Sequence, residues 1–147
     1  MKKITTTLTA IILMIFLIMG CDKYHRDRYT GTWDFVITKY IHEYDDLGIF
    51  VKTEYDTIYS YTGKIKLGNY ENNLIIQYSE NDEIIVHVDN DGSFRTYSIP
   101  PDISVGGKFE DRKNIYFYLL FWNKLDSSGN YVNTGRYDTN GTKKGRR

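Results

Sequence analysis

The stretch "GTWDFVITKYIH", residues 31 to 42, decides the fold class. Large apolar side chains fall on every second position, and polar side chains fill most of the positions between them. The apolar positions are Trp33, Phe35, Ile37 and Ile41. Because successive side chains of a β-strand point to opposite faces, this alternation predicts a strand with one face in a core and one in solvent.

Further runs of the same kind follow along the chain. They are "IFVKTEYDTIYSYTGKIKLG" (49–68), "NNLIIQY" (72–78), "EIIVHV" (83–88), "SFRTYSI" (93–99), "IYFYLLFW" (115–122) and "YVNTGRYDT" (131–139). Turn-forming residues such as "DDLG", "SEND", "DNDG" and "SSGN" separate them. Pro100 and Pro101 interrupt hydrogen bonding, and "KFEDRKN" (108–114), which follows "SVGG", is ambiguous and could hold a short strand with a turn. Since no segment has helical periodicity, seven to nine strands predict an all-β barrel, with a β-sandwich as the alternative.

The beginning of the first predicted strand carries a family motif. "YTGTWDF", residues 29 to 35, resembles the Gly-x-Trp signature of the calycins, which include the lipocalins and fatty-acid-binding proteins. The resemblance implies a single antiparallel up-and-down barrel of about eight strands, closed at the bottom by Trp33. Many lipocalins stack an arginine of the last strand on this tryptophan, and Arg136 lies in a matching place. The barrel-closing residues implied are therefore Gly31, Trp33 and Arg136.

The N-terminal segment has the parts of an export signal. Two lysines precede an apolar run of about a dozen residues, too short for a typical membrane-spanning helix, and the run ends at Gly20. The sequence "IMGC", residues 18 to 21, resembles the lipobox of bacterial lipoproteins, in which the cysteine is acylated after cleavage. This resemblance implies lipidation of Cys21 and a membrane-anchored protein of the bacterial cell envelope, with the outer membrane favoured over the inner and the face left open.

These features divide the chain into four segments. We expect a cleaved lipoprotein signal peptide at 1–20, a polar tether at 21–29, the β-barrel domain at 30–139, and a basic flexible tail at 140–147. Cys21 is the only cysteine, so no disulfide can form within the chain, and the domain depends on packing for its stability. The 19 basic and 19 acidic residues balance, which argues against nucleic acid as a partner.

Residues suited to catalysis or metal binding are scattered. The chain has no Gly-x-Ser-x-Gly motif, and its three histidines, His25, His42 and His87, lack the spacing of metal ligands. The "DNDG" at 89–92 resembles the start of a calcium loop but lacks the downstream glutamate, and it favours a hairpin turn. We therefore expect a protein that is not an enzyme, with no catalytic residue, metal or cofactor.

Two functions fit these observations. The first is binding of a small hydrophobic or aromatic ligand inside a lipocalin-like barrel, since an eight-stranded barrel can hold one small molecule. The expected ligand-binding residues are Phe35, Tyr59, Tyr61, Ile65, Ile76, Val86, Phe117 and Leu119. The alternative is a surface or periplasmic lipoprotein whose barrel or sandwich is filled and which binds a protein or polysaccharide partner. Its 14 tyrosines favour this alternative, because tyrosine is enriched at interfaces.

Overall fold

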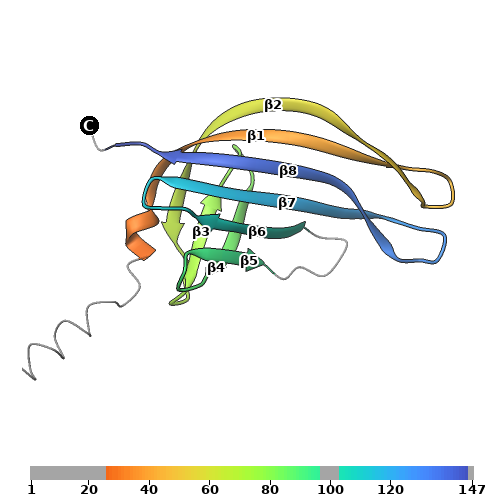
Figure 1. Ribbon diagram of the computed structural model, residues 1–147. Helices are drawn as coiled ribbons and strands as arrows, with labels where there is room; N and C mark the ends of the chain where they lie inside the picture. Colours follow the sequence, from red (N-terminus) through yellow and green to blue (C-terminus); the bar gives the residue numbers. More distant parts are fainter. Residues whose placement is uncertain (1–25, 97–102, 146–147) are drawn as a thin grey trace, which may run out of the picture.

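The computed structural model describes residues 26–96 and 103–145, which form a short 3-10 helix and eight antiparallel strands (Figure 1). Each strand pairs with the next along the chain, and β8 pairs with β1 to close a barrel. The elements are η2 (Arg26–Tyr29), β1 (Gly31–Tyr44), β2 (Phe50–Leu67), β3 (Asn73–Gln77), β4 (Glu83–Val88), β5 (Ser93–Thr96), β6 (Ile103–Phe109), β7 (Asn114–Leu125) and β8 (Tyr131–Lys143). The prediction of a single up-and-down barrel of about eight strands is confirmed, and the sandwich alternative is wrong.

The alternation read from the sequence places the core inside this barrel. Trp33, Phe35 and Ile37 of β1 are fully buried, whereas Asp34 and Val36 between them are exposed. The apolar run of β7 behaves in the same way: Ile115, Phe117 and Leu119 point inward and are buried, and the tyrosines between them are half-buried. The inward side chains of the strands therefore meet in one continuous core, to which β2 contributes only near its C-terminal end.

Three hairpins of the barrel use the same turn. The β1–β2, β4–β5 and β7–β8 connections each have an aspartate followed three residues later by a glycine with φ near +80°. In each turn the glycine amide donates to the aspartate carbonyl oxygen, at 3.0, 3.0 and 3.1 Å. The glycines are Gly48, Gly92 and Gly129. Glycine adopts this backbone conformation without a steric penalty, which explains its recurrence.

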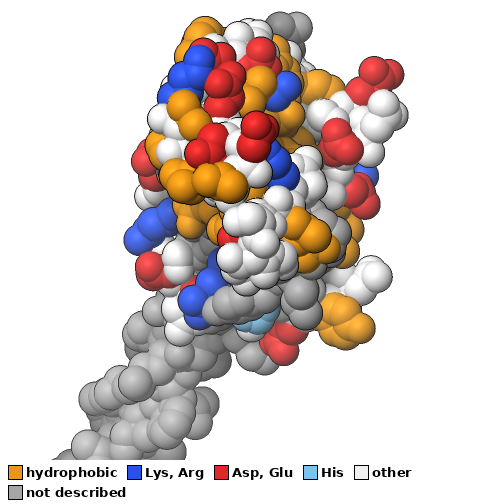
Figure 2. All heavy atoms as spheres, turned by 90° about the vertical axis from the view of Figure 1, so that its right-hand side faces the viewer, with side chains coloured by type: hydrophobic (Ala, Val, Ile, Leu, Met, Phe, Trp, Pro, Cys, Tyr) orange, Lys and Arg blue, Asp and Glu red, His pale blue; other side chains and the backbone are white. Residues whose placement is uncertain are grey.

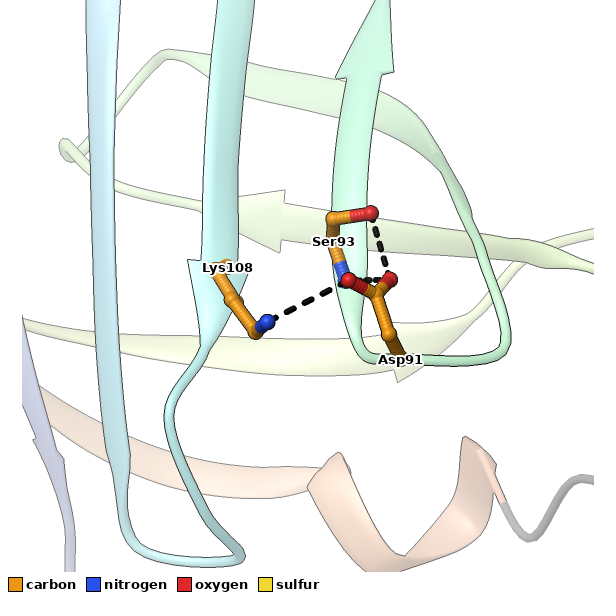
Figure 3. A network of polar contacts seen from close by, with 3 residues as sticks. All are labelled: Asp91, Ser93 and Lys108. Atoms are coloured by element: carbon orange, nitrogen blue, oxygen red, sulfur yellow. Dashed lines mark hydrogen bonds and ion pairs between the residues drawn. The ribbon is translucent and has the colours of Figure 1, made fainter.

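The β4–β5 turn confirms that "DNDG" forms a hairpin. Asp91 accepts hydrogen bonds from the amide and hydroxyl of Ser93 and forms an ion pair with Lys108 of β6 at 3.2 Å (Figure 3). The Ser93 hydroxyl and amide, followed by Lys108, lower the pKa of the Asp91 carboxyl. Within the described residues no three His, Cys, Asp or Glu side chains gather as metal ligands. The Asp91 carboxylate therefore stabilises the turn through these contacts.

The barrel has one tall side and one short side. Strands β1, β2, β7 and β8 have 12 to 18 residues, whereas β3, β4 and β5 have 4 to 6. Figure 1 shows the four long strands continuing past the short ones as an arm, which ends in the β1–β2 and β7–β8 hairpins. The two hairpin tips touch each other, since the Ser127 hydroxyl donates to the Leu47 carbonyl oxygen at 2.9 Å. The arm is thus a four-stranded wall above one side of the barrel.

The structure corrects the predicted segment boundaries at both ends of the domain. Residues 26–29, predicted as part of a tether, form η2, and Tyr29 is buried with its ring stacked 3.9 Å from that of Phe109. At the other end, β8 continues to Lys143, so residues 140–143 belong to the barrel and not to a tail. Both segments are rich in polar and basic residues and contribute only a few inward side chains to the core. The sequence pattern therefore did not identify them as a helix and a strand.

One strand was missed. The segment 103–109 forms β6, whereas the sequence suggested a possible short strand only from residue 108 onward. Gly106 and Gly107 lie directly beneath aromatic rings of neighbouring strands, where a Cβ would collide with Tyr118 or with Phe94 and Phe117. The glycines therefore serve close packing within a strand and not a turn.

The predicted lipidation site and the predicted signal peptide lie outside the described residues. This applies to Cys21 and to all of 1–20. Within residues 26–96 and 103–145, no helix has the length and apolar character needed to cross a membrane.

Candidate ligand site at the open end of the barrel

Aromatic side chains seal the end of the barrel that is next to η2. Trp33 is fully buried, and its indole Nε1 donates to the Tyr29 carbonyl oxygen at 2.9 Å. Its ring lies 6.0 Å from that of Phe109 in an edge arrangement and 6.5 Å from that of Phe35 in a stacked one. Trp33, which was predicted to close the bottom of the barrel, is thus buried at this end and hydrogen-bonded to η2. We call this the closed end.

Inward-facing glycines make the closed end tight. A side-chain atom added at Gly141 would meet Ile115 and the Phe35 ring, and one added at Gly107 would meet Phe94 and Phe117. Large rings thus occupy the space left by glycines on the strands beside them. The lower half of the barrel is filled by its own side chains.

Arg136 does not lie at the closed end, and its predicted role beside the tryptophan is wrong. In the β1–β8 pairing Trp33 faces Lys143, whereas Arg136 faces Tyr40 near the arm. The Arg136 side chain lies on the outer surface, where it forms an ion pair with Asp138 at 2.7 Å and its guanidinium lies 5.0 Å from the centre of the Tyr118 ring. The motif match placed it on the correct strand but on the wrong face and at the wrong height.

Gly31 stands at the beginning of β1, beside Lys143. Its φ of +133° favours glycine, and a Cβ there would lie 3.1 Å from the Lys143 side chain. The Lys143 amine donates to the Arg28 carbonyl oxygen at 2.8 Å. Lys143, and not Arg136, is therefore the basic residue of the last strand that lies across from Trp33 and is fastened to η2.

The predicted ligand-binding residues separate into two groups. Six of them lie in the packed core and are essentially inaccessible to solvent: Phe35, Ile65, Ile76, Val86, Phe117 and Leu119. Tyr59 and Tyr61 differ, because Tyr59 is 36% exposed and Tyr61 is half-buried against the core. Only these two lie where a molecule could enter from solvent.

The end of the barrel beneath the arm is lined by half-buried hydrophobic side chains, most of them aromatic. Tyr61, Ile103, Phe121 and Tyr137 pack on the core from this side, and the rings of Phe121 and Tyr137 are 4.5 Å apart. Each points inward by its place in the strand register. Together with Tyr59 and Tyr78 they form what we call the mouth. Below it lie the fully buried side chains of Ile37, Leu119 and Thr139.

A charged pair stands at the edge of the mouth. Lys39 of β1 and Asp56 of β2 are 2.9 Å apart, and the Lys39 amine lies 5.9 Å from the centre of the Tyr137 ring. Asp56 is the extra residue of a β-bulge, opposite the Lys39/Tyr40 junction of β1. The hydrogen bond with Asp56, followed by the nearby Tyr137, raises the pKa of Lys39. The mouth is thus apolar inside and polar along the wall that the arm continues.

Tyr78 joins the mouth from the end of β3, the strand next to β2. It follows β3 directly and is 4% exposed. Burial raises the pKa of the Tyr78 hydroxyl to about 12, and the nearby Asp82 carboxylate and the Tyr59 and Tyr137 hydroxyls add to the effect. These polar groups therefore converge on one side of the mouth, and the neutral phenol is the stable form there.

Tyr78 should make the domain lose stability in strong alkali. A hydroxyl whose folded-state pKa lies above its unfolded value of about 10 stabilises the fold below that pH, and this contribution disappears as pH rises toward 12. Between pH 10 and 12 we expect the contribution of Tyr78 to the free energy of unfolding to fall by up to about 1.4 kcal/mol per pH unit. Urea unfolding of wild type and Tyr78→Phe at several pH values measures this. The difference between the two proteins should shift in favour of Tyr78→Phe above pH 10, and a pH-independent difference would contradict the assignment.

The arm exposes apolar side chains to solvent at its tips. Leu47 and Phe50 are 62% and 54% exposed, and Ile49, Val51 and Leu125 are similarly open. Figure 2 looks onto this end of the molecule and shows hydrophobic side chains among acidic and basic ones. Asp45, Asp46 and Asp126 make the tips acidic as well. The arm is therefore a second surface that could meet another molecule.

Several residues of the mouth were absent from the predicted site. Phe121 and Tyr137 continue the inward alternation of their strands, so the pattern could have identified them. Lys39 could not have been found in this way, because a lysine on the apolar side of a strand breaks the pattern. Tyr78 continues the inward alternation of Leu74 and Ile76, so the pattern could have identified it as well.

Comparison with known proteins leaves the family of this chain open. No protein-family model matches the sequence, and no curated protein matches it. A search of solved structures finds a chain described as Odorant Binding Protein OBP1, with a TM-score of 0.37 and 13% sequence identity. The match covers 85% of this chain and 77% of that one. A similarity of this size carries no functional argument, so the fold rests on the barrel topology itself.

Proposed function

We propose that the mouth binds a small hydrophobic or aromatic molecule, and that the protein is a binding protein and not an enzyme. The observation that supports this is the contrast between the two ends of the barrel. At the closed end the rings are packed against glycines, whereas at the mouth Tyr61, Phe121 and Tyr137 remain half-buried. Aromatic side chains that converge at one end of a barrel and are partly open to solvent are typical of the lining of small-ligand sites. A ligand would therefore occupy the upper half of the barrel only.

The mouth can be tested with a fluorescent apolar probe. N-Phenyl-1-naphthylamine should bind wild type with one molecule per chain. Phe121→Ala should weaken binding by about tenfold, because the lost ring contact is worth roughly 1.5 kcal/mol or more. Fluorescence titration of the domain measures both values.

Phe50→Ala is the matched control, since Phe50 is also an aromatic residue of a long strand but lies on the arm. We expect it to bind the probe like wild type. If Phe50→Ala abolishes binding and Phe121→Ala does not, the probe binds the arm. A wild-type domain that binds no probe would overturn the proposal.

A second candidate function is binding of a protein or polysaccharide through the arm. The exposed apolar tips favour it, because large apolar side chains gathered on a surface commonly mark interaction sites. In this case the barrel would be a support, and the arm would carry the contact. The Phe50→Ala and Phe121→Ala comparison separates this function from the first.

We also propose that acylation of Cys21 anchors the protein to a membrane of the bacterial cell envelope. The lipobox resemblance supports this, and three acyl chains, as bacterial lipoproteins typically carry, would hold firmly. The first described residues form η2 at the closed end, with the arm at the opposite end of the molecule (Figure 1). An anchor that precedes η2 would therefore leave the mouth and arm facing away from its attachment.

Cys21→Ser should remove the anchor. We expect this variant to incorporate no palmitate analogue and to move from the membrane fraction to the soluble fraction. The measurement is metabolic labelling followed by membrane fractionation in high salt. Cys21→Ser protein that still resists extraction would show that something other than acylation holds the protein.

A further inference from the structure

Thr139 is a polar residue in an otherwise apolar part of the barrel. It lies on β8 and points inward, opposite Ile37 of β1 and Phe117 of β7. The residue is fully buried, and within residues 26–96 and 103–145 its hydroxyl oxygen Oγ1 has no hydrogen-bond partner. It is the one buried polar residue of the described barrel core.

Packing does not explain this hydroxyl. Valine has nearly the same shape as threonine and is equally suited to a strand, but it buries no polar atom. A buried hydroxyl without a partner lowers stability, and most such groups in proteins are hydrogen-bonded. A residue that served only the core would therefore be better as valine. The hydroxyl points to a partner outside the protein chain.

The position of Thr139 identifies where that partner would lie. Tyr137, two residues earlier on the same face of β8, belongs to the mouth, and Gly141, two residues later, lies against the packed Phe35 ring. Thr139 thus stands at the boundary between the open and the filled halves of the barrel. The inner end of a molecule held in the mouth would reach this level.

The side chains around Thr139 also indicate whether the group that accepts its hydrogen bond is charged or neutral. The side chains that flank Thr139 across the sheet, Ile37 and Phe117, are apolar and fully buried. The nearest basic group described at the mouth, Lys39, lies at its edge and is already paired with Asp56. A carboxylate at this depth would be costly, whereas a neutral oxygen can accept the one hydrogen bond available.

We propose that Thr139 donates a hydrogen bond to a neutral oxygen at the buried end of the ligand, so that the ligand is a small aromatic or apolar molecule ending in a carbonyl. This inference rests on the proposed ligand site in the mouth. Thr139 would select among molecules of equal size, while the rings of Phe121 and Tyr137 hold their apolar part.

Two probes of nearly identical shape test this selection. 2-Acetylnaphthalene carries a carbonyl oxygen where 2-isopropenylnaphthalene carries a methylene group. Displacement of N-phenyl-1-naphthylamine from wild type should show the ketone binding about fivefold more tightly, the usual effect of one hydrogen bond. Thr139→Val should bind both compounds equally, and Thr139→Ser, which keeps the hydroxyl, should retain the preference for the ketone.

The outcomes separate this inference from the proposed function. Equal affinity of wild type for the two compounds, or a preference that persists in Thr139→Val, would overturn the role of Thr139 while leaving the mouth as a ligand site. Failure of both compounds to displace the dye, or of the dye to bind at all, would overturn the proposed ligand site itself. Thermal unfolding should show Thr139→Val to be at least as stable as wild type. If Thr139→Val fails to fold, the comparison of the two probes on wild type and Thr139→Ser still tests the inference.

Discussion

Replacing Trp33 with alanine is expected to reduce the free energy of unfolding by about 3 to 5 kcal/mol, the cost of a large-to-small change in a core. Trp33 is fully buried, and its ring contacts those of Phe35 and Phe109. The substitution also removes the hydrogen bond from the indole to the Tyr29 carbonyl oxygen, which connects η2 to the barrel. Urea unfolding followed by circular dichroism measures the loss.

Trp122→Ala provides the matched control, because it removes the same side chain from β7, where the residue is only half-buried. We expect it to cost clearly less than Trp33→Ala. Trp33→Phe should lie between them, since phenylalanine keeps an aromatic ring but cannot donate the hydrogen bond. Equal and small losses at Trp33 and Trp122 would show that Trp33 does not hold the closed end together.

Gly63→Ala is expected to destabilise the barrel by about 3 kcal/mol, at the upper end of what overpacking usually costs. Gly63 points inward from β2 opposite Trp33, and a Cβ there would overlap the main-chain oxygen of Gln77 and lie 2.9 Å from the Phe35 ring. A main-chain oxygen held in a sheet cannot move aside as a flexible side chain can. Gly63 is thus a point of close approach between strands.

Gly145→Ala tests whether this loss comes from the lack of space. No atom outside its immediate chain neighbours lies within 4 Å of the position that its Cβ would take, and its φ is not positive. We expect unchanged stability in the same urea experiment. If Gly63→Ala were as harmless as Gly145→Ala, β2 and β3 could separate at this point without penalty, and the packing described at the closed end would be wrong.

The barrel itself could be predicted from the sequence because its signals are local. Alternating residues such as Trp33, Phe35 and Ile37 define a strand without reference to the rest of the chain, and the "DNDG" at 89–92 defines a turn. The Gly-x-Trp motif then indicated which end of the barrel is closed. Each of these features depends on side chains within a few residues of one another.

The arm could not be predicted in the same way. Residues 51 to 60 of β2 are all exposed, so no buried face imposes an alternation that the sequence would record. The pairing with β1 alone holds them in place along most of this length. The bulge at Asp56 also reverses which side chains point inward, and such a shift is visible only once the partner strand is known.

The position of Arg136 along the barrel axis also could not be predicted, because it depends on the register between β8 and β1. Counting along β8 by strand alternation puts Arg136 on the face opposite to Gly135 and Tyr137, but only the pairing with β1 shows how far it lies from Trp33. Register is set by contacts across the sheet, which the sequence of one strand does not contain. The mouth could not be assembled from the sequence for the same reason, because its side chains come from β2, β6, β7, β8 and the residue that follows β3.

The pairing of β1 with β8 makes folding depend on a single distant encounter. Every other strand pair is a hairpin joined by a short connection, whereas partners such as Trp33 and Lys143 are about one hundred residues apart. The hairpins can form early and in any order, but the ring closes only when its first and last strands meet, at the entropic cost of a long loop. A chain interrupted before β8 would leave β1 and β7 with unpaired edges, and such edges recruit other chains. The seam between β1 and β8 is therefore where we expect both the rate-limiting step of folding and the main risk of aggregation.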